Sequence, residues 1–210
     1  TNGQMALASG KSITTNGGNV VLWSNSANIA SGTANNEIVL AGSNTISTSG
    51  GKIVLAGGLD DGSNGGVAND GIPDGYSYRG GYTGSAIDVR NNVSLLSGGG
   101  NVIIRGEANP SGTIGTYNGT RGNGVYFGTG FKLDSGVGTI NIKAIGDSDH
   151  ALSLEYGQFA IPRPDFNLIL HVPAAVAQKL VDAKVAGVIG HLNSGTTIPA
   201  SKIYSDAGIS

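Results

Sequence analysis

The stretch TISTSGGKIVL, residues 45–55, joins a short β-branched run, a Gly-Gly turn and a second apolar run. The chain repeats this phrase as SITTNGGNVVL at 12–22, as VSLLSGGGNVII at 93–104 and, in degenerate form, as FKLDSGVGTINI at 131–142. A repeated unit of strand, turn and strand is typical of a stacked solenoid, in which each unit buries its apolar side chains against its neighbours. The phrase therefore predicts an all-β, repetitive fold.

The composition narrows the class of protein. Of the 210 residues, 37 are Gly and 39% are hydrophobic, which indicates tight turns between buried strands rather than disorder. The net charge of −2, with no basic run, argues against nucleic acid as a partner. No apolar stretch reaches the roughly 18 residues of a membrane span. The absence of Cys excludes disulfides and thiolate metal sites.

Two regions interrupt the repeat within an expected single domain of residues 1–210. Residues 57–85 are rich in Gly, then in acidic residues and then in Tyr, and they predict a long loop insertion at the surface. Residues 147–210 have a different texture, in which a Pro is followed by apolar residues at helical spacing and then by a Gly. This pattern predicts one short α-helix at about 174–186, near the end of the stack.

The four copies of the phrase, over roughly residues 1–145, resemble the repeats of filamentous-haemagglutinin-like exoproteins of bacterial two-partner secretion systems. This resemblance implies a right-handed parallel β-helix. It also implies export across a Gram-negative cell envelope and a role in surface adhesion, in biofilm or in presenting a distal domain. The insertion at 57–85 and the C-terminal part depart from that family's pattern.

The insertion carries a candidate calcium loop. Its stretch NDGIPD, residues 69–74, is similar to the calcium loops of thrombospondin type 3 repeats, and two further Asp residues precede it. Closely spaced carboxylates and carbonyls are the ligands that Ca²⁺ prefers. The candidate ligands are Asp60, Asp61, Asn69, Asp70 and Asp74. The alternative is that Asp, Asn, Gly and Pro only form turns here.

Aromatic residues follow this loop at once, as Tyr76, Tyr78, Arg79 and Tyr82. Such a cluster on a loop would stack on sugar rings or anchor a protein partner, since Tyr combines contact area with a polar tip. The alternative is that these tyrosines pin the loop to its own scaffold.

The expected function is that of an extracellular structural or adhesive protein without catalysis, secreted or at the cell surface of a Gram-negative bacterium. Its partners would be a host or matrix glycan or protein receptor, or further copies of the chain joined head to tail into a filament. The alternative is a carbohydrate-active enzyme of the polysaccharide lyase or hydrolase type. That alternative requires charged residues from several strands to converge in one groove; the candidates are Asp88, Arg90, Arg105, Asp134 and Lys143.

Overall fold

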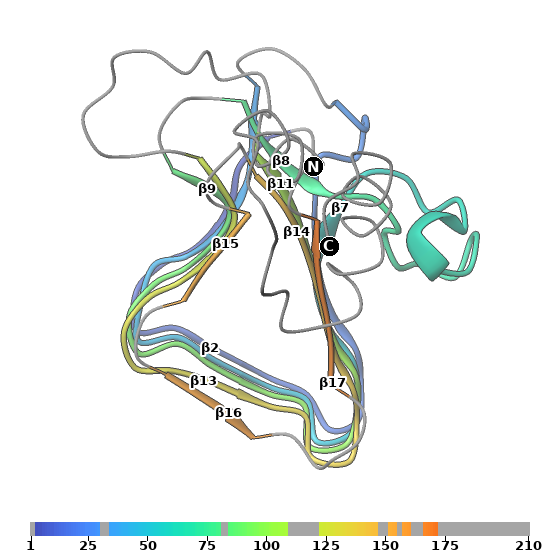
Figure 1. Cartoon of the computed structure of the whole chain (residues 1–210). Coiled ribbons are helices and arrows are strands. Elements are labelled where there is room, and N and C mark those ends of the chain that lie inside the picture. The colour runs from blue at the N-terminus through green and yellow to red at the C-terminus, as the bar shows by residue number, and fades with distance from the viewer. Residues whose placement is uncertain are drawn as a thin grey trace, which may run out of the picture.

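The computed structural model describes residues 3–29, 34–80, 84–108, 122–146, 151–154, 157–160 and 166–171. In this part of the chain the strands form three sheets, which enclose a common interior like the sides of a triangle (Figure 1). The chain visits the sheets in turn, so that one strand of each belongs to every pass.

The strands are short, and neighbouring strands are parallel except for one pair in sheet C. Sheet A contains β1 (Met5–Leu7), β5 (Ile38–Leu40), β9 (Ser85–Val89), β12 (Asn123–Phe127) and β15 (Leu152–Leu154). Sheet B contains β2 (Ser12–Thr14), β6 (Thr45–Ser47), β10 (Ser94–Leu96), β13 (Phe131–Asp134) and β16 (Gly157–Ala160). Sheet C contains β3 (Val20–Ser24), β7 (Ile53–Gly57), β11 (Val102–Ala108), β14 (Ile140–Ile145) and β17 (Phe166–His171). It also contains β8 (Ser77–Arg79), which pairs with the end of β11, and β4 (Asn35–Asn36), which pairs with β8.

The four copies of the repeated phrase lie in register. Their first strands are β2, β6, β10 and β13 of sheet B, where Ile13 pairs with Ile46, Ile46 with Leu95, and Leu95 with Leu133. Their second strands are β3, β7, β11 and β14 of sheet C. Each phrase is therefore a corner that passes from one sheet to the next.

The prediction of a single right-handed β-helix solenoid is wrong. The chain is all-β, but its strands are divided among several separate sheets, and one pair is antiparallel, between β4 (Asn35–Asn36) and β8 (Ser77–Arg79). Repetition along the chain reveals the strands, but strand pairing depends on contacts between distant residues. The only helical element among the described residues is the 3-10 turn η1 (Ser63–Gly65). The helix expected at about 174–186 lies outside the described residues.

The corner has a Gly at one position in all four copies, and close stacking explains it in the last three. A Cβ on Gly51 would overlap the carbonyl oxygen of Gly18. In the same way, a Cβ on Gly100 would overlap the carbonyl of Gly51, and one on Gly138 that of Gly100. We call the row of Gly18, Gly51, Gly100 and Gly138 the glycine ladder. A side chain at Gly51, Gly100 or Gly138 would push two layers apart, so the close packing of the layers requires Gly there.

Hydroxyl groups stabilise the same corner. Thr15, Thr48 and Ser135 each donate a hydrogen bond to the carbonyl oxygen three residues later, at 2.5, 2.5 and 2.6 Å. Ser97 donates to the carbonyl oxygen of Gly100 in the same way. These carbonyl groups lie at a turn between two sheets, outside the strand ladders. The side-chain hydroxyl therefore gives each of them a hydrogen-bond donor.

The main core lies between the three sheets. It is formed by inward-pointing side chains of the strands up to β15, and Ile38, Ile46, Ile53, Leu95 and Ile104 are fully buried. The insertion lies outside this core, against the outer face of sheet C (Figure 1). No helix within the described residues is long and apolar enough to cross a membrane.

Candidate functional site

The insertion docks on the outer face of sheet C through a small apolar contact. Because side chains alternate along a strand, Val54 and Ala56 of β7 point away from the main core, as Ile103 of β11 does. Ile72 of the insertion is buried against Val54 and Ala56 and forms a second apolar cluster with them. This contact places the polar residues on either side of Ile72 next to the sheet.

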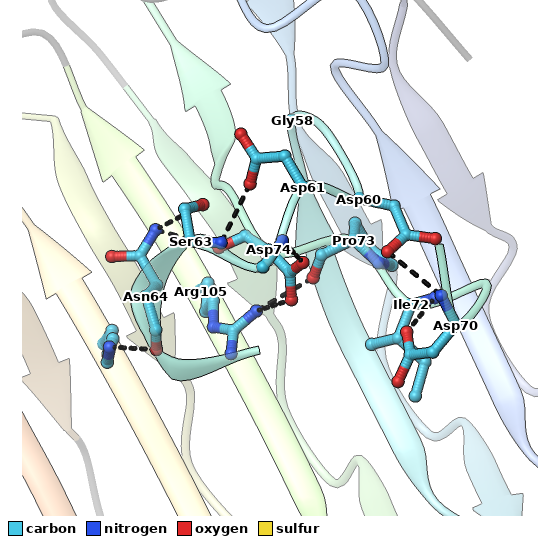
Figure 2. A network of polar contacts seen from close by, with 12 residues as sticks. Gly58, Asp60, Asp61, Ser63, Asn64, Asp70, Ile72, Pro73, Asp74 and Arg105 are labelled. Carbon is cyan, nitrogen blue, oxygen red and sulfur yellow. Dashed lines mark hydrogen bonds and ion pairs between the residues drawn. The ribbon is translucent and has the colours of Figure 1, made fainter. Parts of the chain in front are cut away.

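Three carboxylates of the insertion shape its turns (Figure 2). Asp60 accepts hydrogen bonds from the backbone N–H groups of Asp70 and Gly71 at 3.2 and 2.8 Å. Asp61 accepts from the N–H of Ser63 at 2.9 Å, and Asp70 accepts from that of Ile72 at 2.9 Å. These bonds are typical of Asp in turns.

The fourth carboxylate, Asp74, is buried with Arg105 (Figure 2). The exposed fractions of the two side chains are 1% and 4%, and Arg105 Nη1 lies 3.6 Å from Asp74 Oδ1. Asp74 Oδ2 accepts a hydrogen bond from the N–H of Gly62 at 2.7 Å. Arg105 Nη1 donates to the carbonyl of Pro73 at 2.8 Å. The Arg105 guanidinium, on β11 of sheet C, thus anchors the insertion at Pro73 and Asp74.

Asn64 links the insertion to the next strand of sheet C. Its side-chain amide donates to the carbonyl of Asp74 at 2.8 Å and accepts from the hydroxyl of Tyr76 at 3.0 Å. Its backbone carbonyl accepts from Nζ of Lys143, on β14, at 2.6 Å. Arg105 and Lys143 are neighbours across β11 and β14, so two adjacent cations hold one loop.

A cleft of about 240 Å³ lies between the insertion and sheet C. The insertion contributes Gly66, Val67, Ile72 and Asp74 to its walls, among others. Sheet C and the turns before its strands contribute Lys52, Asn101, Ile103, Arg105, Thr139 and Asn141. The cleft therefore combines polar groups of both charges with a few apolar side chains.

Burial changes the ionisation of the groups around this cleft. It lowers the pKa of Arg105, although the charge of Asp74 opposes the shift. It also lowers the pKa of Lys143, in the same direction as the neighbouring charge of Arg105. The pKa of the Tyr76 hydroxyl is raised by burial, and that of Glu107, on β11, is raised for the same reason. The outer face of sheet C is thus partly shielded from water where the insertion covers it.

The candidate calcium ligands do not converge. Asp60, Asp61, Asp70 and Asp74 accept hydrogen bonds from backbone N–H groups within the insertion, and Asn69 has a left-handed backbone with a φ of 61°. No three His, Cys, Asp or Glu residues in the described ranges are grouped so that they would hold a metal ion. The calcium site stays a prediction, and the geometry favours the alternative of turn formation.

The tyrosine cluster forms no open stacking surface among the described residues. Tyr78 is fully buried and Tyr76 is partly buried over Asn64. Arg79 donates to Glu37 at 2.6 Å, in a largely buried ion pair that Gln4 also joins at 2.7 Å. These contacts agree with tyrosines that pin the loop. Tyr82 lies outside the described residues, and receptor binding by this cluster stays a prediction.

The charged residues considered for an enzyme lie on three different sheets. Asp88 is on β9 of sheet A, and its ion pair with Arg90 measures 2.9 Å. Asp134 is on sheet B, near Lys132, whereas Arg105 and Lys143 are on sheet C. The first pair borders an open groove of about 660 Å³ on sheet A, together with Tyr126. Neither this groove nor the cleft on sheet C collects all five residues.

Sequence reasoning missed Asn141 as a site residue, although the phrase contained a signal for it. In the four copies, the outward position of the second strand is Val21, Val54, Ile103 and Asn141. A polar residue thus replaces an apolar one at the position that lines the cleft. Aligning the copies of the phrase with one another identifies this exception.

The chain was also compared with known proteins. No family model, no curated protein and no solved structure matches it. Its resemblance to filamentous-haemagglutinin-like exoproteins therefore stays a prediction from the repeated phrase.

Proposed function

We propose that this chain is a structural, adhesive module of an extracellular bacterial surface, in which the stacked sheets form a stiff scaffold. Its loops would contact a glycan or protein receptor, and the edge of the stack would accept a further layer of strands. The paired, in-register layers support the mechanical part of this proposal, because continuous hydrogen-bonded ladders resist bending. The Cys-free composition agrees with an exported protein stabilised by packing.

One observation carries the proposal, namely the uncovered first layer. Among the described residues, β1, β2 and β3 each pair with a strand on one side only. Most inward-facing side chains of this layer are also incompletely buried, namely Met5, Leu7, Ile13 and Leu22. Ile13 is partly exposed, whereas Ile46 and Leu95, in the same column, are fully buried. An edge with unpaired strands and uncovered apolar side chains is a surface on which another strand layer gains both hydrogen bonds and burial.

The glycine ladder shows which way the next layer would lie. A Cβ on Gly51, Gly100 or Gly138 points at the layer before it in the sequence. A Cβ on Gly18 meets only Thr15 of its own turn, at 3.7 Å. The place that a preceding layer would occupy over Gly18 is therefore open among the described residues. A second copy of the chain, or further repeats of a longer chain, would supply that layer.

The test is electron microscopy and light scattering of the purified chain over a range of concentrations. We expect linear particles that lengthen with concentration. Gly18→Ala should abolish them without changing the melting temperature, because its Cβ would collide with an added layer. Ser94→Ala, a change of similar size in an interior layer, is the control and should assemble normally. Short single particles at every concentration would contradict assembly through this edge.

A further inference from the structure

We propose that the cleft between the insertion and sheet C binds one residue of a neutral saccharide. The inference deepens the adhesive role by naming a ligand class and a site, and its biological meaning rests on that proposed function. The cleft itself is defined by the packing of Ile72 and by the Asp74–Arg105 pair, which hold the insertion at a set distance from the strands.

Three polar atoms around the cleft are buried without a hydrogen-bond partner among the described residues. They are Oδ1 of Asp74, Nε of Arg105 and Oδ1 of Asn141. Asp74 and Arg105 are at least nine-tenths buried as whole residues, and both line the wall of the cleft. Buried polar groups in proteins are normally paired, and a group left over indicates a missing ligand or water. Of the two acceptors and one donor, Asp74 Oδ1 has only the ion pair with Arg105 at 3.6 Å, and Arg105 Nε and Asn141 Oδ1 have no hydrogen-bond partner in the described part of the chain.

The chemistry of these atoms favours hydroxyl groups over ions. A hydroxyl donates to a carboxylate or amide oxygen and accepts from a guanidinium N–H, so neighbouring hydroxyls of one sugar satisfy both kinds of atom. An anion would meet Asp70 and Asp74, and a cation would meet Lys52 and Arg105. Because the walls carry both charges, a neutral ligand has the lowest desolvation cost.

The size and the apolar part of the cleft agree with a single sugar ring. A volume of about 240 Å³ is far larger than one water molecule needs. Ile72 and Ile103 lie on its walls, beside the polar atoms. A sugar ring presents a C–H face to such side chains and hydroxyls to the polar atoms at its rim.

The open groove on sheet A is the rival location. It is larger, but the Arg90 side chain there is 54% exposed and is paired with Asp88. Neither residue has a buried side-chain atom that lacks a partner. Of the two grooves, only the cleft on sheet C therefore has such atoms in its wall residues. Glu37, Tyr78 and Arg79 also carry buried atoms without a hydrogen-bond partner in the described ranges, but they line neither groove.

Ligand-observed NMR tests the proposal with glucose, galactose, N-acetylglucosamine and cellobiose as neutral probes, and with glucuronate and sulfate as charged ones. We expect at least one neutral probe to bind. Asn141→Leu, which keeps the branching of the side chain and removes the amide, should weaken binding about tenfold. Asn91→Leu, at an exposed Asn of the sheet A groove, is the matched control and should bind as the wild type does.

A second measurement separates binding from folding. Because Asn141→Leu removes a buried acceptor that has no partner, the melting temperature without ligand should stay the same or rise. A lower melting temperature would mean that the amide supports the fold and would count against the site. The proposal is overturned if no neutral probe binds at about 10 mM, a concentration above a millimolar Kd. It is equally overturned if only charged probes bind, or if Asn91→Leu weakens binding as much as Asn141→Leu.

This test is independent of the assembly test. If no sugar binds while Gly18 still controls filament growth, only the saccharide site fails. If a sugar binds while the chain never assembles, the cleft stands and the role of the uncovered edge fails.

Discussion

The corners between sheets B and C and the insertion at 57–85 differ in how they satisfy backbone polar groups. Both are turns that leave backbone groups outside the strand ladders. At the corners the same two features recur in all four copies. A hydroxyl donates a hydrogen bond to the carbonyl oxygen three residues later, and the residue of the glycine ladder has no side chain that would keep a neighbouring layer away. In the insertion no single contact recurs at every turn, and the polar network includes a buried ion pair beside atoms that lack a hydrogen-bond partner.

This difference distinguishes the part of the molecule that forms the scaffold from the part that could bind a ligand. Corner contacts that recur in every layer add the same stabilisation to each layer, and a ligand could not distinguish one layer from another by them. The insertion breaks the repeat in one pass only. It brings the Asp74 carboxylate against the Arg105 guanidinium of the next pass, and a cleft lies beside this pair. Recognition is therefore expected where the repetition stops.

The largest expected effect concerns the corner. Gly100→Ala should lower the free energy of unfolding by at least about 3 kcal/mol, because its Cβ would overlap the backbone of Gly51 and force two layers apart. Gly18→Ala, at the same position of the first copy, should change it by less than about 1 kcal/mol, since that Cβ has room. Urea unfolding followed by circular dichroism measures both. Equal losses would show that the stacking contact is not the cause.

The next effect concerns the anchor of the insertion. Arg105→Met should cost about 3 kcal/mol or more, because it leaves the Asp74 carboxylate buried without its counter-charge. The matched change Arg90→Met breaks an exposed pair and should cost less than about 1 kcal/mol. Limited proteolysis would report where the damage lies, with new cleavage between residues 57 and 76 in Arg105→Met alone. Cleavage throughout the chain would mean that the anchor supports the whole scaffold.

The smallest expected effect is a change with pH. Burial raises the pKa of Glu107 above its ordinary 4.5, so the unfolded chain ionises this group at a lower pH than the folded chain does. The free energy of unfolding should therefore decline as the pH rises from 4.5 to the raised pKa, and then level off for this group. In Glu107→Gln this decline should be absent, leaving the variant more stable than the wild type at neutral pH. Urea unfolding at several pH values checks it, and parallel profiles for the two proteins would refute the assignment.

The strands were predictable because their cause is local. Alternating apolar residues around a Gly-Gly turn led to the strands at 12–22, 45–55, 93–104 and 131–142, and β2/β3, β6/β7, β10/β11 and β13/β14 lie there. The division into sheets was not predictable in this way. It depends on pairings across 33, 49 and 38 residues, and on an antiparallel pair whose strand Asn35–Asn36 has no apolar alternation.

The site was predictable only in part, for the same reason. The turn-forming role of Asp60, Asp61 and Asp70 depends on neighbours within the insertion, and it was considered from the sequence as the alternative to calcium. The partner of Asp74 is on a strand of the next pass, and Lys143 reaches Asn64 over 79 residues. Composition and spacing along the chain contain no information about such contacts.

The in-register stacking has a consequence for how such a protein changes in length. Neighbouring strands of a sheet are about 4.8 Å apart, so every pass extends the stack by that amount, whether 33 or 49 residues separate its corners. The extra residues project sideways as a loop. The height of the stack thus depends on the number of phrases, and the residues between them are free to change in number. A gene that gains or loses one phrase changes the reach of its product by one fixed step, whereas a gain between phrases creates a new binding loop at unchanged reach.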